Sequence, residues 1–400
     1  MSLAQADALL PVAEGERSTG LLPSQLLRAA VGQGRNAAAA TEIVAAEPIA
    51  DDQIQPASLD LRLGEVAYRV RASFLPGARD TVQDKLDLLS MHRIDLSGGA
   101  VLEKDCVYIV PLLESLALRK RVSALANPKS SIGRLDVFAR VITDYGIEFD
   151  RIREGYKGPL YAEISPRAFS ILVRTGSRLV QLRVRRGSPL FRDTALRRLH
   201  AETPLVEALP GMAPDADPGA IRNGLAFTAD VAGERSGGIV GYKARRHTGL
   251  IDVDRIDHYD PRDFWEPVYP HKGPKGPDGV VLDPYDFYIL ATREAVVVPP
   301  DHAAEMVPYD ATVGEFRVHY AGFFDPGFGS AEAQGTGSRG VLEVRSHEVP
   351  FLIEHGQVVG RMIYEPLIAR PEKLYGGAIG SSYQRQGLAL SKHFKKVPMG

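Results

Sequence analysis

The sequence predicts a mainly β protein of two tandem barrels of distorted jelly-roll type, preceded by a short helical arm. Short segments rich in β-branched and aromatic residues, such as "CVYIVPL" at 106–112 and "DFYILAT" at 286–292, end at glycine, proline or charged residues, a pattern typical of strands. The chain has 39 glycines and 28 prolines, which indicates many turns. Its 400 residues exceed one typical hydrophobic core, so two domains are expected.

The two barrels are predicted because the sequence resembles itself at an offset of 180 residues. The segment "VLEKDCVYIVPLLES" at 101–115 matches "VLDPYDFYILATREA" at 281–295, and "LVRTGSRLVQL" at 172–182 matches "LIEHGQVVGRM" at 352–362. The constant offset of these blocks favours an internal duplication. The alternative is two unrelated β domains with similar strand and turn patterns.

Helical periodicity is confined to a few places. One is "PSQLLRAAV" at 23–31, where Ser24 suits the N-cap, and another is "DTVQDKLDLLSMH" at 80–92. The predicted organisation is an N-terminal helical arm at 1–53, a first copy at 54–190, a linker at 191–218, a second copy at 219–370 and a C-terminal lid at 371–400.

Seven arginines lie between Arg178 and Arg198, where the first copy passes into the linker. We expect most of this stretch to be a solvated edge. The alternative is that some of these arginines face a polyphosphate or another subunit.

The composition excludes several classes of protein. The formal net charge is only −2, so no overall field attracts nucleic acid or a membrane surface. No run of 18 apolar residues is present, and the first residues lack a secretory pattern, so a cytoplasmic protein without membrane contact is expected. The only cysteine is Cys106, which excludes a disulfide framework and a zinc site of several cysteines.

The segment "KSSIGR" at 129–134 can bind an anion. Lys129 and Arg134 supply positive charge, and the hydroxyls of Ser130 and Ser131 supply directional donors. The alternative is an ordinary turn or helix cap, because such short patterns are common by chance.

The segment "FDPGFG" at 324–329 is a turn between aromatic residues. Proline and glycine favour a tight reversal, which could hold a nucleoside with Asp325 accepting a sugar hydroxyl. The alternative is a β-turn without a ligand.

Two carboxylates, Glu163 in "LYAEIS" and Glu343 in "GVLEVR", lie within apolar strands. Burial would raise the pKa of either group into the range that general acid–base catalysis needs. The alternative is that each points outward, because strand side chains alternate between two faces. The sequence contains no Walker A loop, Rossmann fingerprint or HExxH motif.

Taken in order, these segments resemble the deoxycytidine triphosphate (dCTP) deaminase family of the dUTPase-like superfamily. The resemblance rests on five segments: "QIQPASLDLRLG" at 53–64, "KSSIGR", "FDPGFG" followed by "GVLEV" at 340–344, "LIEHGQVVGRMIYEPL" at 352–367 and "YQRQG" at 383–387. It implies dUTPase-like barrels and hydrolysis of dCTP to dUTP and ammonia, which supplies dUTP for dTMP synthesis. It also implies Mg²⁺ bound through the triphosphate, no zinc, no metal-ligating residue, and a homo-oligomer that resembles a trimer of repeats. The signature of zinc-dependent base deaminases, H-x-E…P-C-x-x-C, is absent from the sequence.

The resemblance also implies roles for individual residues. Ser130 and Arg134 lie beside the reacting base, Lys129 and Ser131 hold phosphates, and the catalytic glutamate matches both Glu343 and Glu163. A lysine that the family places in the tail is replaced by Ser382. The remaining substrate-binding residues that the resemblance implies are Ala321, Asp325, Gly327, Phe328, Tyr375, Tyr383 and Gln386.

The two copies differ in complementary ways. The first keeps the phosphate turn but lacks Asp-Pro-Gly in its hairpin, whereas the second keeps the hairpin and has Asp310 and Gly314 in place of Ser130 and Arg134. We therefore expect a composite site, in which the first copy supplies the turn and the second supplies Glu343. A threefold ring cannot alternate two kinds of copy, so such a site implies unequal interfaces. Open alternatives are dUTP hydrolysis, a bifunctional dUMP-forming enzyme, and a nucleotide-binding protein without turnover.

Overall fold

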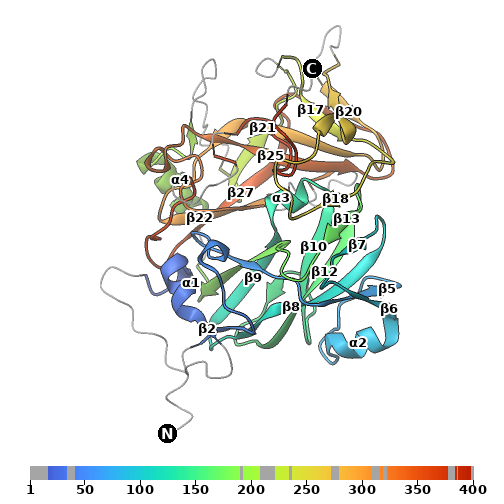
Figure 1. Cartoon of the computed structure of the whole chain (residues 1–400). Helices are drawn as coiled ribbons and strands as arrows, with labels where there is room; N and C mark the ends of the chain where they lie inside the picture. The colour runs from blue at the N-terminus through green and yellow to red at the C-terminus, as the bar shows by residue number, and fades with distance from the viewer. Residues whose placement is uncertain are drawn as a thin grey trace.

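The chain folds into two β-rich halves, an N-terminal half (17–189) and a C-terminal half (192–397), drawn in blue to green and in yellow to red in Figure 1. The prediction of a mainly β fold is confirmed. The computed structural model describes residues 17–33, 41–189, 192–207, 221–233, 237–271, 279–308, 316–318, 322–376, 383–384 and 386–397.

Two sheets form the barrel of the N-terminal half, and each has a linear path with one or two further strands. The first sheet follows β1 (Gly20–Leu21), β14 (Val180–Arg186), β9 (Val122–Pro128) and β11 (Arg151–Ile152), and β4 (Leu59–Leu61) also pairs with β14. The second follows β10 (Val137–Thr143), β12 (Lys157–Pro166), β8 (Val107–Ala117), β3 (Ile43–Ala45) and β2 (Val31–Gln33), and β5 (Val66–Val70) pairs with β8 and with β6 (Ser90–Asp95).

The C-terminal half repeats this architecture. Its first sheet follows β19 (Trp265–Val268), β17 (Gly241–Ala244), β21 (Phe287–Val296), β25 (Ser338–Ser346) and β23 (Phe316–Val318), and β15 (Val206–Glu207) pairs with β21. Its second follows β16 (Leu225–Thr228), β27 (Val358–Pro366), β22 (His302–Pro308) and β24 (Phe323–Phe324). A small sheet pairs β20 (Gly279–Leu282) with β26 (Phe351–Glu354).

Strand register repeats at the offset of 180 residues seen in the sequence. Ile109 of β8 lies opposite Glu163 of β12, and Ile289 of β21 lies opposite Glu343 of β25. The pairings of β9 with β14 and of β22 with β27 show the same offset at every common position. The two predicted carboxylates therefore occupy equivalent places in equivalent sheets.

Helices are few and mostly short. Among the described residues, the α-helices are α1 (Ser24–Ala30), α2 (Val82–Leu89), α3 (Ser130–Gly133) and α4 (Asp193–Glu202). A capping box opens α2, because the Thr81 hydroxyl accepts from the Asp84 N–H and the Asp84 carboxylate accepts from the Thr81 N–H. The prediction of Ser24 as the N-cap of α1 is wrong: Pro23 holds that position, and the Ser24 N–H donates to Pro56 O instead.

The segment predicted as a helical arm contributes more than a helix. Its described part also contains β1, β2 and β3, and β3 pairs with β8 inside the second sheet of the N-terminal half. The described part of the predicted linker contains α4 and β15, and β15 pairs with β21. Both segments are thus built into the neighbouring sheets.

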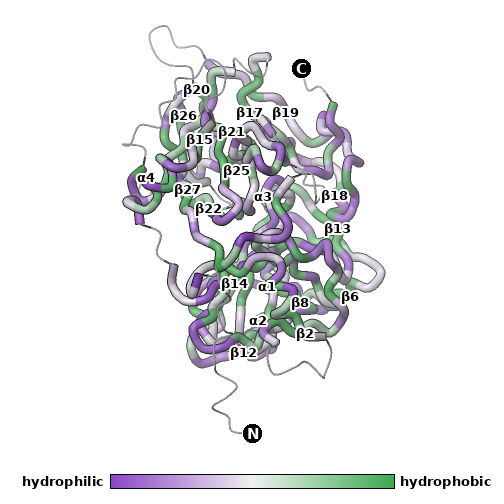
Figure 2. Tube along the Cα trace, turned by 90° about the vertical axis from the view of Figure 1, so that its left-hand side faces the viewer, coloured by the Kyte–Doolittle hydropathy of each residue, from purple (hydrophilic) through white to green (hydrophobic). Residues whose placement is uncertain are grey.

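The two halves are joined by strand pairing and by aromatic packing. Strand β18 (Ile251–Asp252), from the C-terminal half, pairs in parallel with β13 (Ile171–Val173), which also pairs with β7 (Ala100–Leu102). Trp265 is fully buried against Phe169 of the N-terminal half, with ring centroids 5.4 Å apart, and Phe394 of the tail packs on the same indole. Figure 2 shows hydrophobic residues along the strands of both halves, and α3 where the halves meet.

The arginine-rich stretch is only partly solvated. Arg198 is exposed and pairs with Glu202, as expected of a solvated helix face. The expectation is wrong for Arg183 and Arg186, which are only 3% and 6% exposed in β14, the strand that runs towards the other half. Arg183 contacts the C-terminal half directly, as described below.

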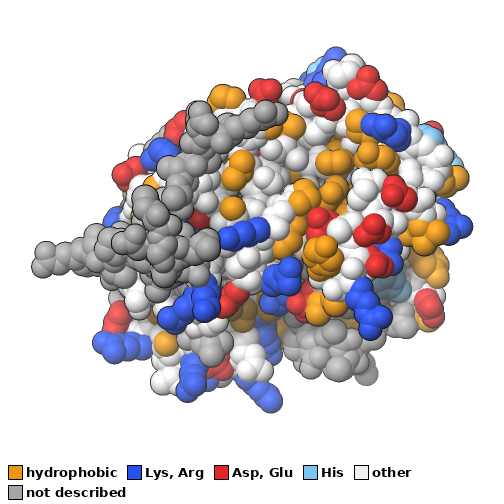
Figure 3. Space-filling view, turned by 90° about the horizontal axis from the view of Figure 1, so that it is seen from below, with side chains coloured by type: hydrophobic (Ala, Val, Ile, Leu, Met, Phe, Trp, Pro, Cys, Tyr) orange, Lys and Arg blue, Asp and Glu red, His pale blue; other side chains and the backbone are white. Residues whose placement is uncertain are grey.

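The outer surface carries both signs of charge. On the face shown in Figure 3, lysine and arginine side chains are interspersed with aspartate, glutamate and hydrophobic side chains. Among the described residues, no helix is both long enough and apolar enough to cross a membrane.

Candidate active site

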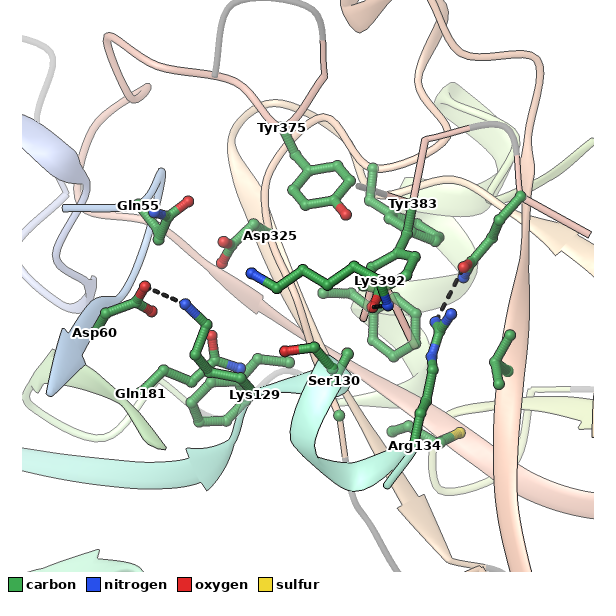
Figure 4. A pocket seen from close by; sticks show the side chains of 18 of the residues that line it. Gln55, Asp60, Lys129, Ser130, Arg134, Gln181, Asp325, Tyr375, Tyr383 and Lys392 are labelled. Atoms are coloured by element: carbon green, nitrogen blue, oxygen red, sulfur yellow. Dashed lines mark hydrogen bonds and ion pairs between the residues drawn. The ribbon is translucent and has the colours of Figure 1, made fainter. Parts of the chain in front are cut away.

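A cavity of about 310 Å³ lies where the two halves and the tail meet (Figure 4). The N-terminal half contributes α3 and its flanks, the C-terminal half contributes β24 and β25, and the tail covers one side. Ten of the predicted site residues line this cavity: Lys129, Ser130, Ser131, Arg134, Asp325, Phe328, Glu343, Tyr375, Tyr383 and Gln386.

The predicted phosphate turn is a single helical turn that follows β9. Lys129 lies at its N-cap with an extended backbone, and its carbonyl accepts from the N–H groups of Ile132 and Gly133. The turn presents Ser130 and Ser131 to the cavity. The Lys129 ammonium pairs with the buried carboxylate of Asp60 on β4. One side of the cavity therefore carries hydroxyls and a lysine whose charge is already partly balanced.

Arg134 connects the turn with the tail and with the other half. Its side chain is 3% exposed, and Nη2 donates to Gln386 Oε1 at 2.9 Å while Nη1 donates to Ala389 O at 3.1 Å. The guanidinium carbon lies 3.9 Å from the ring centroid of Tyr383, a cation–π contact. The Nε atom lies 3.9 Å from Glu343 Oε1. One side chain thus holds the tail over the cavity and faces its carboxylate.

Glu343 is a buried acid in β25, between β21 and β23. Burial raises its pKa to about 8, although the nearby charge of Arg134 opposes that shift. Asp136, just after the turn, raises the pKa further and forms an ion pair with Arg345, two residues beyond Glu343. This carboxyl can therefore gain and lose a proton near neutral pH, as a general acid–base group must.

The Asp-Pro-Gly hairpin is held by Arg183 from the other half. The guanidinium donates to Ala304 O at 2.8 Å, to Phe324 O at 2.9 Å and to Asp325 Oδ1 at 3.1 Å. It also stacks over the ring of Phe323, with its carbon 4.0 Å from the centroid. Burial raises the pKa of Asp325, and the charge of Arg183 works against this. The buried arginine therefore fixes the hairpin and keeps the aspartate paired.

The hairpin also docks the start of the tail. Gly327 has a φ of +93°, and a Cβ there would lie 3.1 Å from Leu374 Cβ and 3.2 Å from Tyr375 N, so glycine is required. The Tyr375 N–H donates to Pro326 O at 2.8 Å, and its ring lies 5.5 Å from that of Phe328. Gly327 thus shapes the hairpin without lining the cavity itself.

The structure does not bring Glu163 to this cavity. Its carboxylate pairs with Arg140 and accepts from the Ser73 hydroxyl at 2.7 Å, all within the N-terminal half. Phe149 covers Arg140, with the guanidinium carbon 3.7 Å from the ring centroid. Ala321 lies outside the described residues, as do Asp310 and Gly314.

Comparison with known proteins agrees with this geometry. Residues 18–188 match the N-terminal domain of 2'-deoxycytidine 5'-triphosphate deaminase (DCD), and residues 192–394 match its C-terminal domain. The chain belongs to the dCTP deaminase family. It is 53% identical to the crystal structure of 2'-deoxycytidine 5'-triphosphate deaminase from Agrobacterium tumefaciens, with a TM-score of 0.78, over 88% of this chain and all of that one.

Shorter curated relatives of the dCTP deaminase family carry the name "dCTP deaminase, dUMP-forming". The protein from Beutenbergia cavernae is 27% identical over 163 residues, which are 40% of this chain and 77% of the relative. The protein from Parafrankia sp. is 30% identical over 135 residues, 33% of this chain and 64% of the relative.

The cavity of this family member also contains residues that the sequence analysis did not predict. They are Asp52, Gln55, Asp60, Arg178, Gln181 and Lys392, together with the apolar Met306, Phe323, Phe324 and Val341 and the small Gly322. Gln55 and Asp60 lie within "QPASLDLRLG", a segment on which the family resemblance rests. Their position in this segment could have predicted them as site residues. Arg178 lies in the arginine-rich stretch, for which contact with a polyphosphate was an open alternative, whereas Gln181 and Lys392 lie in segments without a comparable motif.

Proposed function

We propose that the chain deaminates dCTP to dUTP and ammonia in this cavity. The observation that carries the proposal is the position of Glu343, a buried carboxyl with a pKa raised to about 8 that faces Arg134 and the Ser130 turn across the two halves. A hydrolytic deaminase needs a group that takes a proton from water and returns it to the leaving nitrogen. Membership of the dCTP deaminase family supports the choice of substrate.

The reaction balances with one proton shuttle. Glu343 takes a proton from water as the oxygen forms a bond to C4 of cytosine, and the same proton then passes to the 4-amino nitrogen. The C4–N bond breaks and ammonia leaves, and the remaining proton of the new C4 hydroxyl moves to N3, which gives uracil. The Arg134 guanidinium stabilises the carboxylate form that accepts the proton, and the Ser130 hydroxyl is positioned to orient the water.

The triphosphate would lie along the Lys129 side of the cavity, where the hydroxyls of Ser130 and Ser131 supply donors. Mg²⁺ would accompany the triphosphate and neutralise part of its charge. Asp60 suits this ion or one of its water ligands, because its Oδ1 is buried beside the cavity without a hydrogen-bond partner among the described residues. Within the described residues, no three His, Cys, Asp or Glu side chains are grouped to hold a metal by themselves.

We interpret the repeated strand register as the trace of an internal duplication, in which each copy kept a different part of one site. The residues from both copies meet within a single chain, so the composite site does not need a neighbouring subunit to supply the turn. We further propose that the chain forms a homo-oligomer. Its mass in solution, measured by light scattering, tests this: a monomer would contradict the proposal.

A second candidate is a bifunctional enzyme that also releases pyrophosphate and forms dUMP. The curated relatives named "dCTP deaminase, dUMP-forming" favour it. That reaction needs a carboxylate to activate water near phosphorus, and Asp52 and Asp60 line the Lys129 side of the cavity. Asp60 is already engaged in an ion pair with Lys129, which favours deamination alone.

Separate assays of ammonia and pyrophosphate test both candidates. The purified chain is incubated with dCTP or with dUTP in the presence of Mg²⁺. We expect ammonia from dCTP, accumulation of dUTP, and no pyrophosphate from either nucleotide. Equal amounts of ammonia and pyrophosphate from dCTP would establish the dUMP-forming activity. Tight dCTP binding without either product would identify a nucleotide-binding protein and overturn both candidates.

A further inference from the structure

The end of the tail is fastened to both halves at Ser391–Phe394. The Ser391 hydroxyl donates to Ser131 O at 2.7 Å, and His393 Nε2 lies 2.9 Å from Val253 O. Ser391, His393 and Phe394 are all buried, and Phe394 packs on Trp265. The backbone on either side of Lys392 is therefore fixed by contacts with the phosphate turn and with the C-terminal half.

The backbone of Lys392 is itself held at both of its polar groups. Its N–H donates to the Tyr383 hydroxyl at 3.0 Å, and its carbonyl accepts from the Asp257 N–H at 2.9 Å. With its Cα fixed, the side chain extends across the cavity towards the side where Lys129 pairs with Asp60 (Figure 4). The anchored segment Ser391–Phe394 thus directs the Lys392 side chain into the cavity rather than to solvent.

The Lys392 ammonium has no counter-charge of its own. Within the part of the chain that the structure describes, it makes neither a hydrogen bond nor an ion pair. The carboxylate of Asp60 is shared, because it already pairs with Lys129. Burial, and then the positive charge of Lys129, lower the pKa of Lys392, while Asp60 and Asp254 oppose the change.

A partly buried ammonium close to another lysine is energetically unfavourable unless an anion binds beside it. A flexible ammonium near another positive charge ordinarily turns to solvent, whereas Lys392 has an anchored backbone and a side chain that lines the cavity. Two lysines, two serine hydroxyls and Arg178 surround the same side of the cavity, together with Asp60 and with Asp52, which pairs with Arg178. This set of donors fits a group with several negative charges, such as a triphosphate, better than a single carboxylate.

We propose that Lys392 binds the triphosphate of the substrate together with Lys129, and that the anchor at Ser391–Phe394 positions it. The identity of the nucleoside rests on the proposed function, whereas the polyphosphate class of the ligand follows from the side chains themselves. Lys392 then joins Tyr375, Tyr383 and Gln386 as a residue of the C-terminal segment that lines the substrate site.

The test compares Lys392→Met with Lys395→Met, a matched variant that removes an exposed lysine from the same tail. Calorimetry with Mg²⁺ measures the Kd of dCTP, of inorganic triphosphate and of deoxycytidine. We expect K392M to raise the Kd of both triphosphates about 10-fold to 100-fold, because a charge-assisted contact is lost. The Kd of deoxycytidine stays unchanged, K395M matches the unaltered chain, and Lys392→Arg recovers most of the affinity.

Separate readouts distinguish this inference from the proposed function. If the unaltered chain binds dCTP without releasing ammonia and K392M weakens that binding, deamination fails and the role of Lys392 stands. If K392M binds both triphosphates as tightly as the unaltered chain, the inference is overturned, whatever the rate of ammonia release. An unaltered chain that binds neither triphosphate also overturns it. Thermal unfolding of K392M checks that the fold is retained.

Discussion

Glu163 and Glu343 occupy equivalent positions in the two halves, but they have different surroundings. Each lies in the central strand pair of its half, opposite Ile109 or Ile289 at the same offset. Both carboxylates are buried. Glu343 lines the cavity between the halves, and Glu163 does not. The topology therefore places both acids alike, and the side chains around them set the difference.

The partner arginines account for that difference. Arg140 is a residue of the same half as Glu163, and it forms a direct ion pair with that carboxylate, joined by the Ser73 hydroxyl. Arg134 approaches Glu343 from the other half, with its Nε atom 3.9 Å from Glu343 Oε1. Its guanidinium donates hydrogen bonds to the tail. Arg140 therefore pairs directly with its acid, whereas Arg134 faces its acid from 3.9 Å. The two equivalent sheets thus hold one acid in a direct ion pair and place the other beside the cavity.

The strongest test of this contrast substitutes each glutamate by glutamine. We expect Glu343→Gln to lower the rate of ammonia release at least 10³-fold, because the proton shuttle is removed. Glu163→Gln should change that rate less than about threefold, since Glu163 lies outside the cavity. Steady-state ammonia assays with both purified variants measure this. Loss of turnover in E163Q with activity retained in E343Q would refute the composite site.

A second test breaks the link between the halves at the hairpin. Arg183→Met leaves Asp325 buried without its arginine, which should cost about 3–5 kcal/mol of stability and weaken dCTP binding at least 10-fold. The matched control is Arg185→Met, which removes a more exposed partner of Glu365 from the same strand. Denaturant unfolding and calorimetry measure the two effects. Equal losses for both variants would show that Arg183 has no special part in holding the hairpin.

Features that depend on local patterns could be predicted from the sequence. The strands and the turn around Ser130 follow from residues close together in the chain, and the repeat offset follows from comparing two stretches of the sequence. Residues whose environment depends on distant segments could not. Asp60 is an example, because all three residues of β4, including this aspartate, are buried.

Contacts between the two halves could not be predicted from a sequence pattern either. The addition of β18 to β13, and the packing of Trp265 against Phe169, join segments about 80 or more residues apart, which no periodicity reveals. Arg183 and Lys392 belong to the same class. Each is one of several similar basic residues in its stretch, and only the fold shows which one turns inward.

A third test removes the arginine that pairs with Glu163 in the N-terminal half. Arg140→Met removes the charge that pairs with Glu163 and leaves that carboxylate buried with only the Ser73 hydroxyl. We expect a loss of about 2–4 kcal/mol in the free energy of unfolding, with little change in ammonia release. Adding Glu163→Gln should recover part of the stability, because the unpaired charge disappears. A fall in turnover that the second substitution does not reverse would give this region a role in the reaction.

The smallest expected effect is the contribution of Glu343 to the pH dependence of the free energy of unfolding. Because the pKa of Glu343 rises from 4.5 to about 8 on folding, the folded chain binds more protons than the unfolded chain between these values. Its contribution to the free energy of unfolding is therefore favourable below pH 4.5 and is lost as the pH rises through 8. Glu343→Gln lacks this loss, so its melting temperature should exceed that of the unaltered chain by a few degrees at pH 8 and by less at pH 5. Calorimetric scans at the two pH values measure the difference, and a gap that does not widen with pH would show that Glu343 is already ionised in the free protein.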